Sequence, residues 1–170
     1  MSGTEPAPSA SWFLQAAEQF QVGFEPNALS ASPVRHIVVV TCMDARLDLF
    51  RLLGLQIGDA HILRNAGGRV TDDVIRSLVL SSHALGTREV VVIHHTGCGL
   101  HGATNERLRS KVRDATGHCA DHIDFLPIHD VKESVCHDVA AVQRCELLPC
   151  DMVAWGCVYD VTDGSLTRVV

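Results

Sequence analysis

Residues 36–46 read His-Ile-Val-Val-Val-Thr-Cys-Met-Asp-Ala-Arg, and residues 89–98 read Glu-Val-Val-Val-Ile-His-His-Thr-Gly-Cys. In each stretch, an uninterrupted run of valine and isoleucine leads directly into cysteine, histidine or aspartate. A continuous apolar run of this length is typical of a strand that is buried on both faces, as in a parallel sheet. We therefore predict buried strands at residues 36–41 and 89–94, each with reactive side chains just beyond its carboxyl end.

The rest of the chain alternates between helical and extended patterns. Residues 12–21, 47–53, 71–85 and 131–142 are predicted as helices, the polar segment 104–113 as a helix or helical loop, and residues 60–64 and 123–128 as strands. A final hairpin is expected from residues 152–159 and 166–169 around Asp163-Gly164. This alternation predicts an α/β fold with a mostly parallel central sheet and helices on both faces.

Length and composition indicate one domain. The chain has 170 residues, of which 46% are apolar and 20% charged, so residues 11–170 are predicted to form one globular α/β domain behind a flexible tail at 1–10. The net charge of −6 and the lack of a basic run argue against nucleic acid as a partner. No apolar run can span a membrane, and no signal peptide is evident. Seven cysteines without a secretory signal argue against a disulfide framework, so we expect a cytoplasmic protein.

The side chains at the two strand ends form a set of zinc ligands. Cys42 follows the first strand. His95 and Cys98, which are separated by two residues in a glycine-containing turn, follow the other strand. Neighbouring strands lie about 4.8 Å apart, so both ends can supply thiolate and imidazole ligands to one ion. Asp44 can reach the same metal and close the site. If Asp44 instead pairs with Arg46, the site keeps an open position.

Other interpretations of these motifs stay open at this point. His94 is an alternative to His95 as the histidine ligand, and a second metal site is conceivable at His118-Cys119 with His122. Residues 97–102 also match Gly-x-Gly-x-x-Gly, which suggests dinucleotide binding. The segment that follows is polar, however, and lacks an apolar face for packing on a sheet.

The spacing Cys-x-Asp-x-Arg, followed about fifty residues later by His-x-x-Cys, resembles the β-class carbonic anhydrases, as does the Arg64–Gly68 segment between them. The resemblance implies one zinc ion per chain, bound by Cys42, His95 and Cys98, and a zinc-bound hydroxide that attacks carbon dioxide to give bicarbonate. It implies that Asp44 and Arg46 are the catalytic pair, with Asp44 able to ligate zinc at lower pH. It also implies a homodimer or a dimer of dimers.

Two alternative functions use the same residues. Some enzymes that resemble this family hydrolyse carbonyl sulfide or carbon disulfide, and the short chain has few aromatic residues to define the substrate pocket. A permanent bond between Asp44 and zinc would instead make a non-catalytic zinc or redox-sensing protein. Arg46 argues against that second alternative, because a purely structural site does not need it. His101 is the nearest candidate for a proton shuttle in the sequence.

Overall fold

The two valine runs form neighbouring central strands of one sheet. The computed structural model describes residues 11–24 and 29–170, so the tail predicted at 1–10 lies outside the described residues. The strands are β1 (Ile37–Cys42), β2 (Ala60–Asn65), β3 (Glu89–His95), β4 (Val153–Tyr159) and β5 (Leu166–Arg168). Within the described residues the sheet has the order β2-β1-β3-β4-β5. The first four strands are parallel, and β5 is antiparallel to β4, which confirms the predicted hairpin.

Strand register brings the two sequence motifs to the same edge of the sheet. Thr41 of β1 pairs with Ile93 of β3, so Cys42 and His95 both lie at the carboxyl ends of adjacent strands. The Thr41 hydroxyl donates a 2.8 Å hydrogen bond to the Ile93 carbonyl and ties the two ends together. In parallel sheets this edge is where ligands bind.

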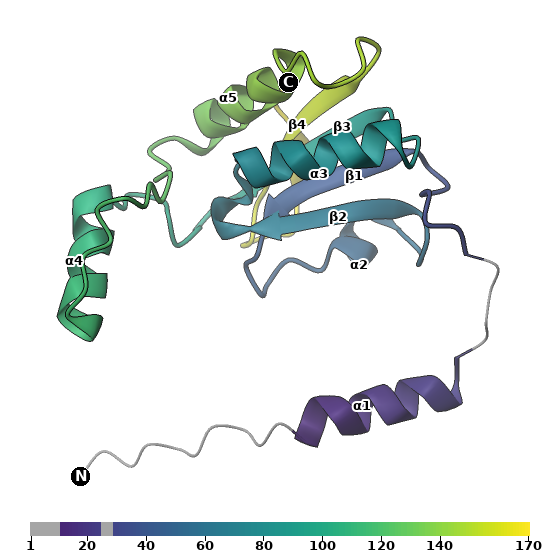
Figure 1. Cartoon of the computed structure of the whole chain (residues 1–170), viewed down its shortest axis with the longest axis horizontal. Helices are drawn as coiled ribbons and strands as arrows, with labels where there is room; N and C mark the ends of the chain where they lie inside the picture. The colour runs from purple at the N-terminus through teal and green to yellow at the C-terminus, as the bar shows by residue number, and fades with distance from the viewer. Residues whose placement is uncertain (1–10, 25–28) are drawn as a thin grey trace.

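Helices cover both faces of the sheet (Figure 1). On one face lie α3 (Asp72–His83) and α5 (Val131–Gln143), whose apolar side chains pack on the buried valines of β1 and β3. On the other face lies the five-residue α2 (Leu49–Leu53), which ends at Gly54 in the left-handed conformation. A short 3-10 turn, η1 (Ala66–Gly68), links β2 to α3.

The α5 helix packs closely against β4 because Gly156 has no side chain. A Cβ atom at this position would lie 2.7 Å from Cγ1 of Val170 and even closer to Cγ1 of Val135. The bare backbone of Gly156 therefore allows the helix, the strand and the C-terminal residue to meet.

The prediction of a strand at residues 123–128 is wrong. Only Ile128 pairs with a neighbour, through an isolated bridge to His101. Leu126 has a φ of 53°, which a strand does not allow, and Pro127 has no N–H to donate. Arginine side chains instead supply the hydrogen bonds that the carbonyls of this segment need. Arg109 donates to the Ile123 carbonyl and Arg69 to the Leu126 carbonyl. The apolar residues of the segment pack as a loop.

Two helices make little contact with the sheet. The α4 helix (Asn105–Thr116) is longer than expected and has no buried residue, and it points away from the body in Figure 1. A dinucleotide fold needs the helix after its glycine motif to pack on the sheet, so this interpretation of residues 97–102 is wrong. The α1 helix (Ser11–Val22) lies apart from the sheet. Among the described residues, no helix is long and apolar enough to cross a membrane.

Candidate metal centre

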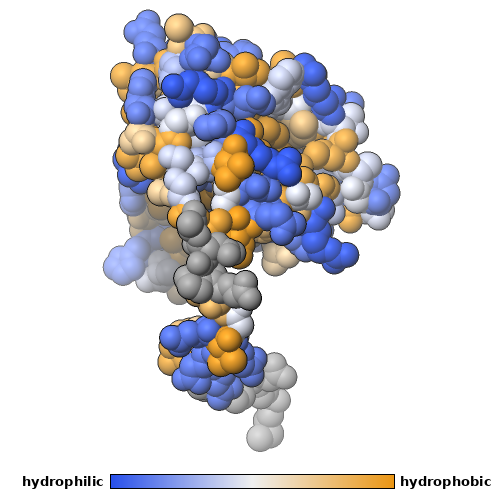
Figure 2. Space-filling model, turned by 90° about the vertical axis from the view of Figure 1, so that its right-hand side faces the viewer, coloured by the Kyte–Doolittle hydropathy of each residue, from blue (hydrophilic) through white to orange (hydrophobic). Residues whose placement is uncertain are grey.

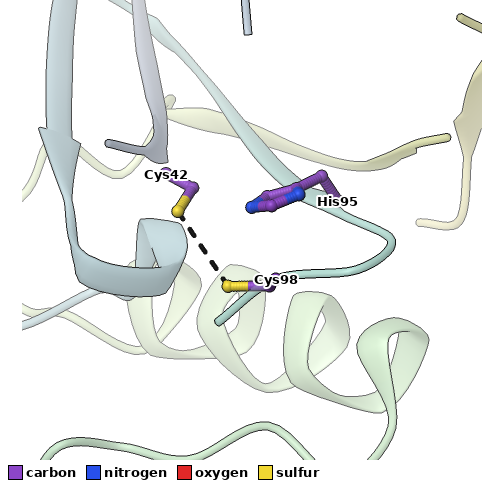
Figure 3. A group of neighbouring side chains, drawn as sticks. All are labelled: Cys42, His95 and Cys98. Carbon is purple, nitrogen blue, oxygen red and sulfur yellow. Dashed lines mark hydrogen bonds between the residues drawn. The ribbon is translucent and has the colours of Figure 1, made fainter. Parts of the chain in front are cut away.

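Three predicted ligands meet at the carboxyl edge of the sheet. Cys42, His95 and Cys98 are all buried, and one potential ligand atom of each lies within 4.8 Å of the others. The two sulfur atoms are 4.0 Å apart. Figure 3 shows both thiols and the imidazole turned toward a common point. This is the geometry of a site with two sulfur ligands and one nitrogen ligand, the donor set typical of zinc.

The hydrogen bonding of His95 leaves one ring nitrogen available to a metal. Its Nδ1 atom donates to the Thr96 carbonyl at 2.9 Å. Its Nε2 atom is buried and has no hydrogen-bond partner. A buried nitrogen without a partner is costly, and a metal ion facing the two thiols would satisfy it. The residues present therefore fit a zinc ion.

Local turns hold the ligands in place. Gly97, with a φ of 62°, makes the turn between His95 and Cys98. Gly68, with a φ of 70°, lies so close to β1 that a Cβ atom would be 2.8 Å from the backbone nitrogen of Cys42. These two glycines allow the backbone to crowd around the ligand group.

Arg46 holds the carboxylate of Asp44. The guanidinium donates from Nε to Oδ1 at 2.9 Å and from Nη2 to Oδ2 at 2.7 Å, and the Arg46 backbone N–H also donates to Oδ1 at 3.0 Å. A further bond from Arg46 to the Gly97 carbonyl fixes the guanidinium to the other motif. Asp44 is thus outside the three-residue ligand group, although its Oδ2 lies 3.8 Å from Nε2 of His95. Of the two arrangements considered from sequence, the structure shows the pairing of Asp44 with Arg46.

The electrostatics of the site follow from these contacts. The hydrogen bond from Arg46 holds the pKa of Asp44 well below its usual range, so the carboxylate stays ionised. Burial lowers the pKa of His95 and keeps the imidazole neutral, which is the form that binds metals. Burial raises the pKa of the Cys98 thiol, so a nearby cation is needed to hold it as a thiolate.

The two adjacent histidines have different surroundings, and His95 is the one in the ligand group. His94 lies on the opposite side of β3, because successive residues of a strand point to opposite faces. Its Nε2 atom lies 3.2 Å from Asp138 of α5, which also forms a buried ion pair with Arg69. No motif in the sequence marks Arg69 or Asp138 as partners. Their only signal was an aspartate on an otherwise apolar helical face.

The second metal site that was considered as an alternative does not form. Within residues 11–24 and 29–170, only Cys42, His95 and Cys98 group as metal ligands, so His118, Cys119 and His122 do not. A cavity of about 270 Å³ opens beside the ligand group instead. Its walls include Met43, Ala66, Gly67, Gly99 and Leu100, together with Cys42, Asp44 and Cys98. Most of these groups are apolar, so the cavity suits a small uncharged molecule.

Two buried thiols and an imidazole at the carboxyl edge of a parallel sheet are typical of a zinc enzyme. Comparison with known proteins supports this class. The carbonic anhydrase family profile matches residues 37–148. β-Carbonic anhydrase 1 of Mycobacterium tuberculosis is 52% identical over 163 residues, covering 92% of this chain and 95% of its relative. The crystal structure of a carbonic anhydrase from Streptococcus mutans superposes with a TM-score of 0.89 at 44% identity, covering 93% of this chain and 95% of that chain.

The chain belongs to the carbonic anhydrase family, and within it to the β class. It is an enzyme of the kind that hydrates carbon dioxide reversibly to bicarbonate. A carbon disulfide hydrolase of Acidithiobacillus thiooxidans is a more distant relative, 36% identical over 78% of this chain and 71% of its own length.

Proposed function

We propose that this chain hydrates carbon dioxide with one zinc ion held by Cys42, His95 and Cys98. The observation that carries the proposal is the buried Nε2 atom of His95, which has no hydrogen-bond partner and faces two thiols. Zinc bound there lowers the pKa of a coordinated water toward 7 and so supplies hydroxide at neutral pH.

Asp44 and Arg46 are the proposed catalytic pair. Asp44 is ionised and its Oδ2 lies 3.8 Å from Nε2 of His95, so the carboxylate borders the position of the metal. In this role it accepts a hydrogen bond from the attacking water molecule and orients it toward carbon dioxide. Arg46 is fixed by Asp44 and by the Gly97 carbonyl, so it keeps the carboxylate ionised and away from the metal. In the closed alternative, Asp44 would leave Arg46 at lower pH and become the fourth ligand of the zinc ion.

The adjoining cavity is the proposed site for the substrate. Its 270 Å³ volume and its lining of Ala66, Gly67, Gly99 and Leu100 suit a small linear molecule without charge. Carbonyl sulfide and carbon disulfide share these properties, and four of the relatives are carbon disulfide hydrolases. The higher identity over almost the whole chain to β-carbonic anhydrase 1 favours carbon dioxide.

Stopped-flow hydration of carbon dioxide tests the proposal directly. Zinc-loaded protein is assayed from about pH 6.5 to about pH 9, together with Cys42→Ser and the matched control Cys136→Ser, which replaces an exposed thiol. We expect activity that rises with pH, is lost in Cys42→Ser and is retained in the control. Hydrolysis of carbon disulfide without hydration of carbon dioxide would contradict the proposed substrate. Zinc binding without either activity would favour the non-catalytic alternative.

We also propose that the protein assembles as a homodimer or a dimer of dimers. The α1 helix exposes several large apolar side chains, including Trp12 at 62% and Phe20 at 61% exposure. Figure 2 shows this helix standing off the body of the molecule. A second copy of the chain would bury this surface.

A cytoplasmic location is the third part of the proposal. All seven cysteines are free thiols, and the ligand group depends on two of them, Cys42 and Cys98. Reduced thiols of this kind persist in the cytosol. Cell fractionation with detection of the protein in the extract would check the location.

A further inference from the structure

A buried carboxylate joins several segments around the metal centre without touching the ligands. Asp138 of α5 is 1% exposed. It accepts hydrogen bonds from Arg69 Nε at 2.7 Å, from Arg69 Nη2 at 3.2 Å and from the Val70 backbone N–H at 3.2 Å, and it lies 3.2 Å from Nε2 of His94. The Nδ1 atom of the neighbouring His137 lies 3.3 Å from the same carboxylate. Five nitrogen atoms around one carboxylate fix its position, and they also fix the segments that supply them.

One of these segments forms the first wall of the substrate cavity. Nε2 of His94 also lies 3.2 Å from the Gly68 carbonyl, and the side-chain amide of Asn65 donates to the Arg69 carbonyl at 2.8 Å. The η1 turn at residues 66–68 is therefore held at both ends by groups that contact Asp138 or Arg69. Gly67 of this turn lines the cavity.

The second wall is attached to the same network. Arg69 donates from Nη1 to the Leu126 carbonyl at 2.8 Å. Two residues later, the Ile128 N–H donates to the Leu100 carbonyl at 3.0 Å. Leu100 lines the cavity, and its Cδ1 atom would lie 2.8 Å from a Cβ placed on Gly67. The two walls thus meet across the cavity.

We propose that Asp138 is a positioning residue for the carbon dioxide cavity, which it shapes by fixing the Gly67 wall through His94 and the Leu100 wall through Arg69. The proposal rests on the proposed function, because it concerns the substrate of that site. Asp138 touches neither a ligand nor the cavity, so its effect reaches the substrate through the two walls. Displacement of the walls would change where carbon dioxide lies relative to the metal.

The first test is the Asp138→Asn variant. The amide keeps the shape of the side chain but turns one acceptor into a donor that faces other donors. We expect kcat/KM for carbon dioxide to fall about tenfold, mainly through a higher KM, because the cavity walls bind substrate. Asp73→Asn is the matched control, since Asp73 also pairs with an arginine but both partners are exposed. This control should keep the kinetics of the unchanged protein.

Two further measurements separate positioning from a purely structural role. The absorption spectrum of the cobalt(II)-substituted protein reports the geometry of the ligands, and we expect Asp138→Asn to leave it unchanged. The double variant Arg69→Met/Asp138→Leu replaces the buried ion pair by apolar groups of similar size, which often restores folding stability. We expect this double variant to recover its thermal unfolding temperature but to keep the raised KM.

Any one of three results would overturn the proposal. The first is a kcat/KM of Asp138→Asn within about twofold of the unchanged protein. The second is an altered cobalt spectrum with a loss confined to kcat, and the third is a normal KM in the stable double variant. Failure of the proposed function is distinguishable from all three. In that case the unchanged protein itself would not hydrate carbon dioxide.

Discussion

Arg46 binds both carboxylate oxygens of Asp44 through its guanidinium, at 2.9 Å and 2.7 Å, and it holds the Gly97 carbonyl at 3.0 Å with the same Nη2 atom. The pair therefore bridges the two motifs that supply the metal ligands. In the proposed mechanism, this pairing keeps the carboxylate off the metal, so that water and substrate can reach it.

Replacing Arg46 by alanine should abolish most of the activity. Without the guanidinium, Asp44 loses its orientation and is free to swing onto the metal, so we expect kcat/KM to fall at least about a hundredfold. Stopped-flow assays would measure the loss, and X-ray absorption at the zinc edge would detect a fourth protein ligand. Arg51→Ala is the control, since the Arg51 side chain is 90% exposed. A fully active Arg46→Ala variant would refute the role of the pair.

The buried carboxylate of Asp138 should make stability depend on pH in the acid range. Burial alone would raise its pKa, but hydrogen bonds from His94 and Arg69 outweigh burial and hold the pKa well below its usual range. The unfolded chain therefore takes up a proton at about pH 4, whereas the folded protein does not. The stabilisation by Asp138 is complete above about pH 4 and is lost as the pH falls toward the folded-state pKa.

Asp138→Asn should lower the free energy of unfolding by about 3–5 kcal/mol at neutral pH, because Arg69 is left as an unpaired buried charge. The difference from the unchanged protein should shrink below about pH 4. Urea unfolding at both pH values would measure it. A difference that stays constant with pH would mean that the ionisation of Asp138 does not contribute to stability.

Adding one methyl group at Gly156 should destabilise the fold. In Gly156→Ala the new Cβ atom would overlap Val135 and Val170, and we expect a loss of about 1–3 kcal/mol as α5 moves away from β4. Gly23→Ala is the matched control, because nothing lies within 4 Å of a Cβ atom there. Equal thermal unfolding temperatures for the two variants would contradict the close packing of α5 on β4.

Polar substitutions in α1 should shift the assembly toward monomers. Phe13 and Phe20 lie seven residues apart on one helical face and are both exposed, so Phe13→Ser/Phe20→Ser removes apolar surface without disturbing the core. We expect sedimentation to show a smaller species, with the far-ultraviolet signal of the sheet retained. Val34→Ser, also at an exposed position, should leave the assembly unchanged. An unaltered oligomer in the double variant would show that α1 does not contribute to the interface.

The sequence predicted the metal centre well because each ligand lies at or just beyond the end of a strand, and strand ends are recognisable from local patterns. Cys42, His95 and Cys98 lie together as expected, and His95 rather than His94 joins the group. The residues themselves also suggested the pair of Asp44 and Arg46, which forms in the structure. The family resemblance added their catalytic roles, which stay predictions. The alternation of helices and strands predicted the mostly parallel sheet but not the order of its strands.

Features that depend on distant contacts were missed. Arg69 and Asp138 are 69 residues apart in the chain, and no local pattern pairs them. Residues 123–128 are as apolar as a strand, but side chains of Arg69 and Arg109 satisfy their carbonyls in a loop. The surroundings of α1 were also beyond prediction, because helical spacing reveals an apolar face without revealing what it contacts.

His94 and His95 are chemically identical neighbours, yet one faces a carboxylate beneath α5 and the other faces two thiols. Their roles are assigned by the hydrogen-bond ladder of β3, in which His94 pairs with Val158 and His95 with Tyr159. A slip of one residue along this ladder would exchange the two imidazoles and dismantle the ligand group without changing any amino acid. Metal binding by this enzyme therefore depends on the register in which β3 pairs with its neighbouring strands.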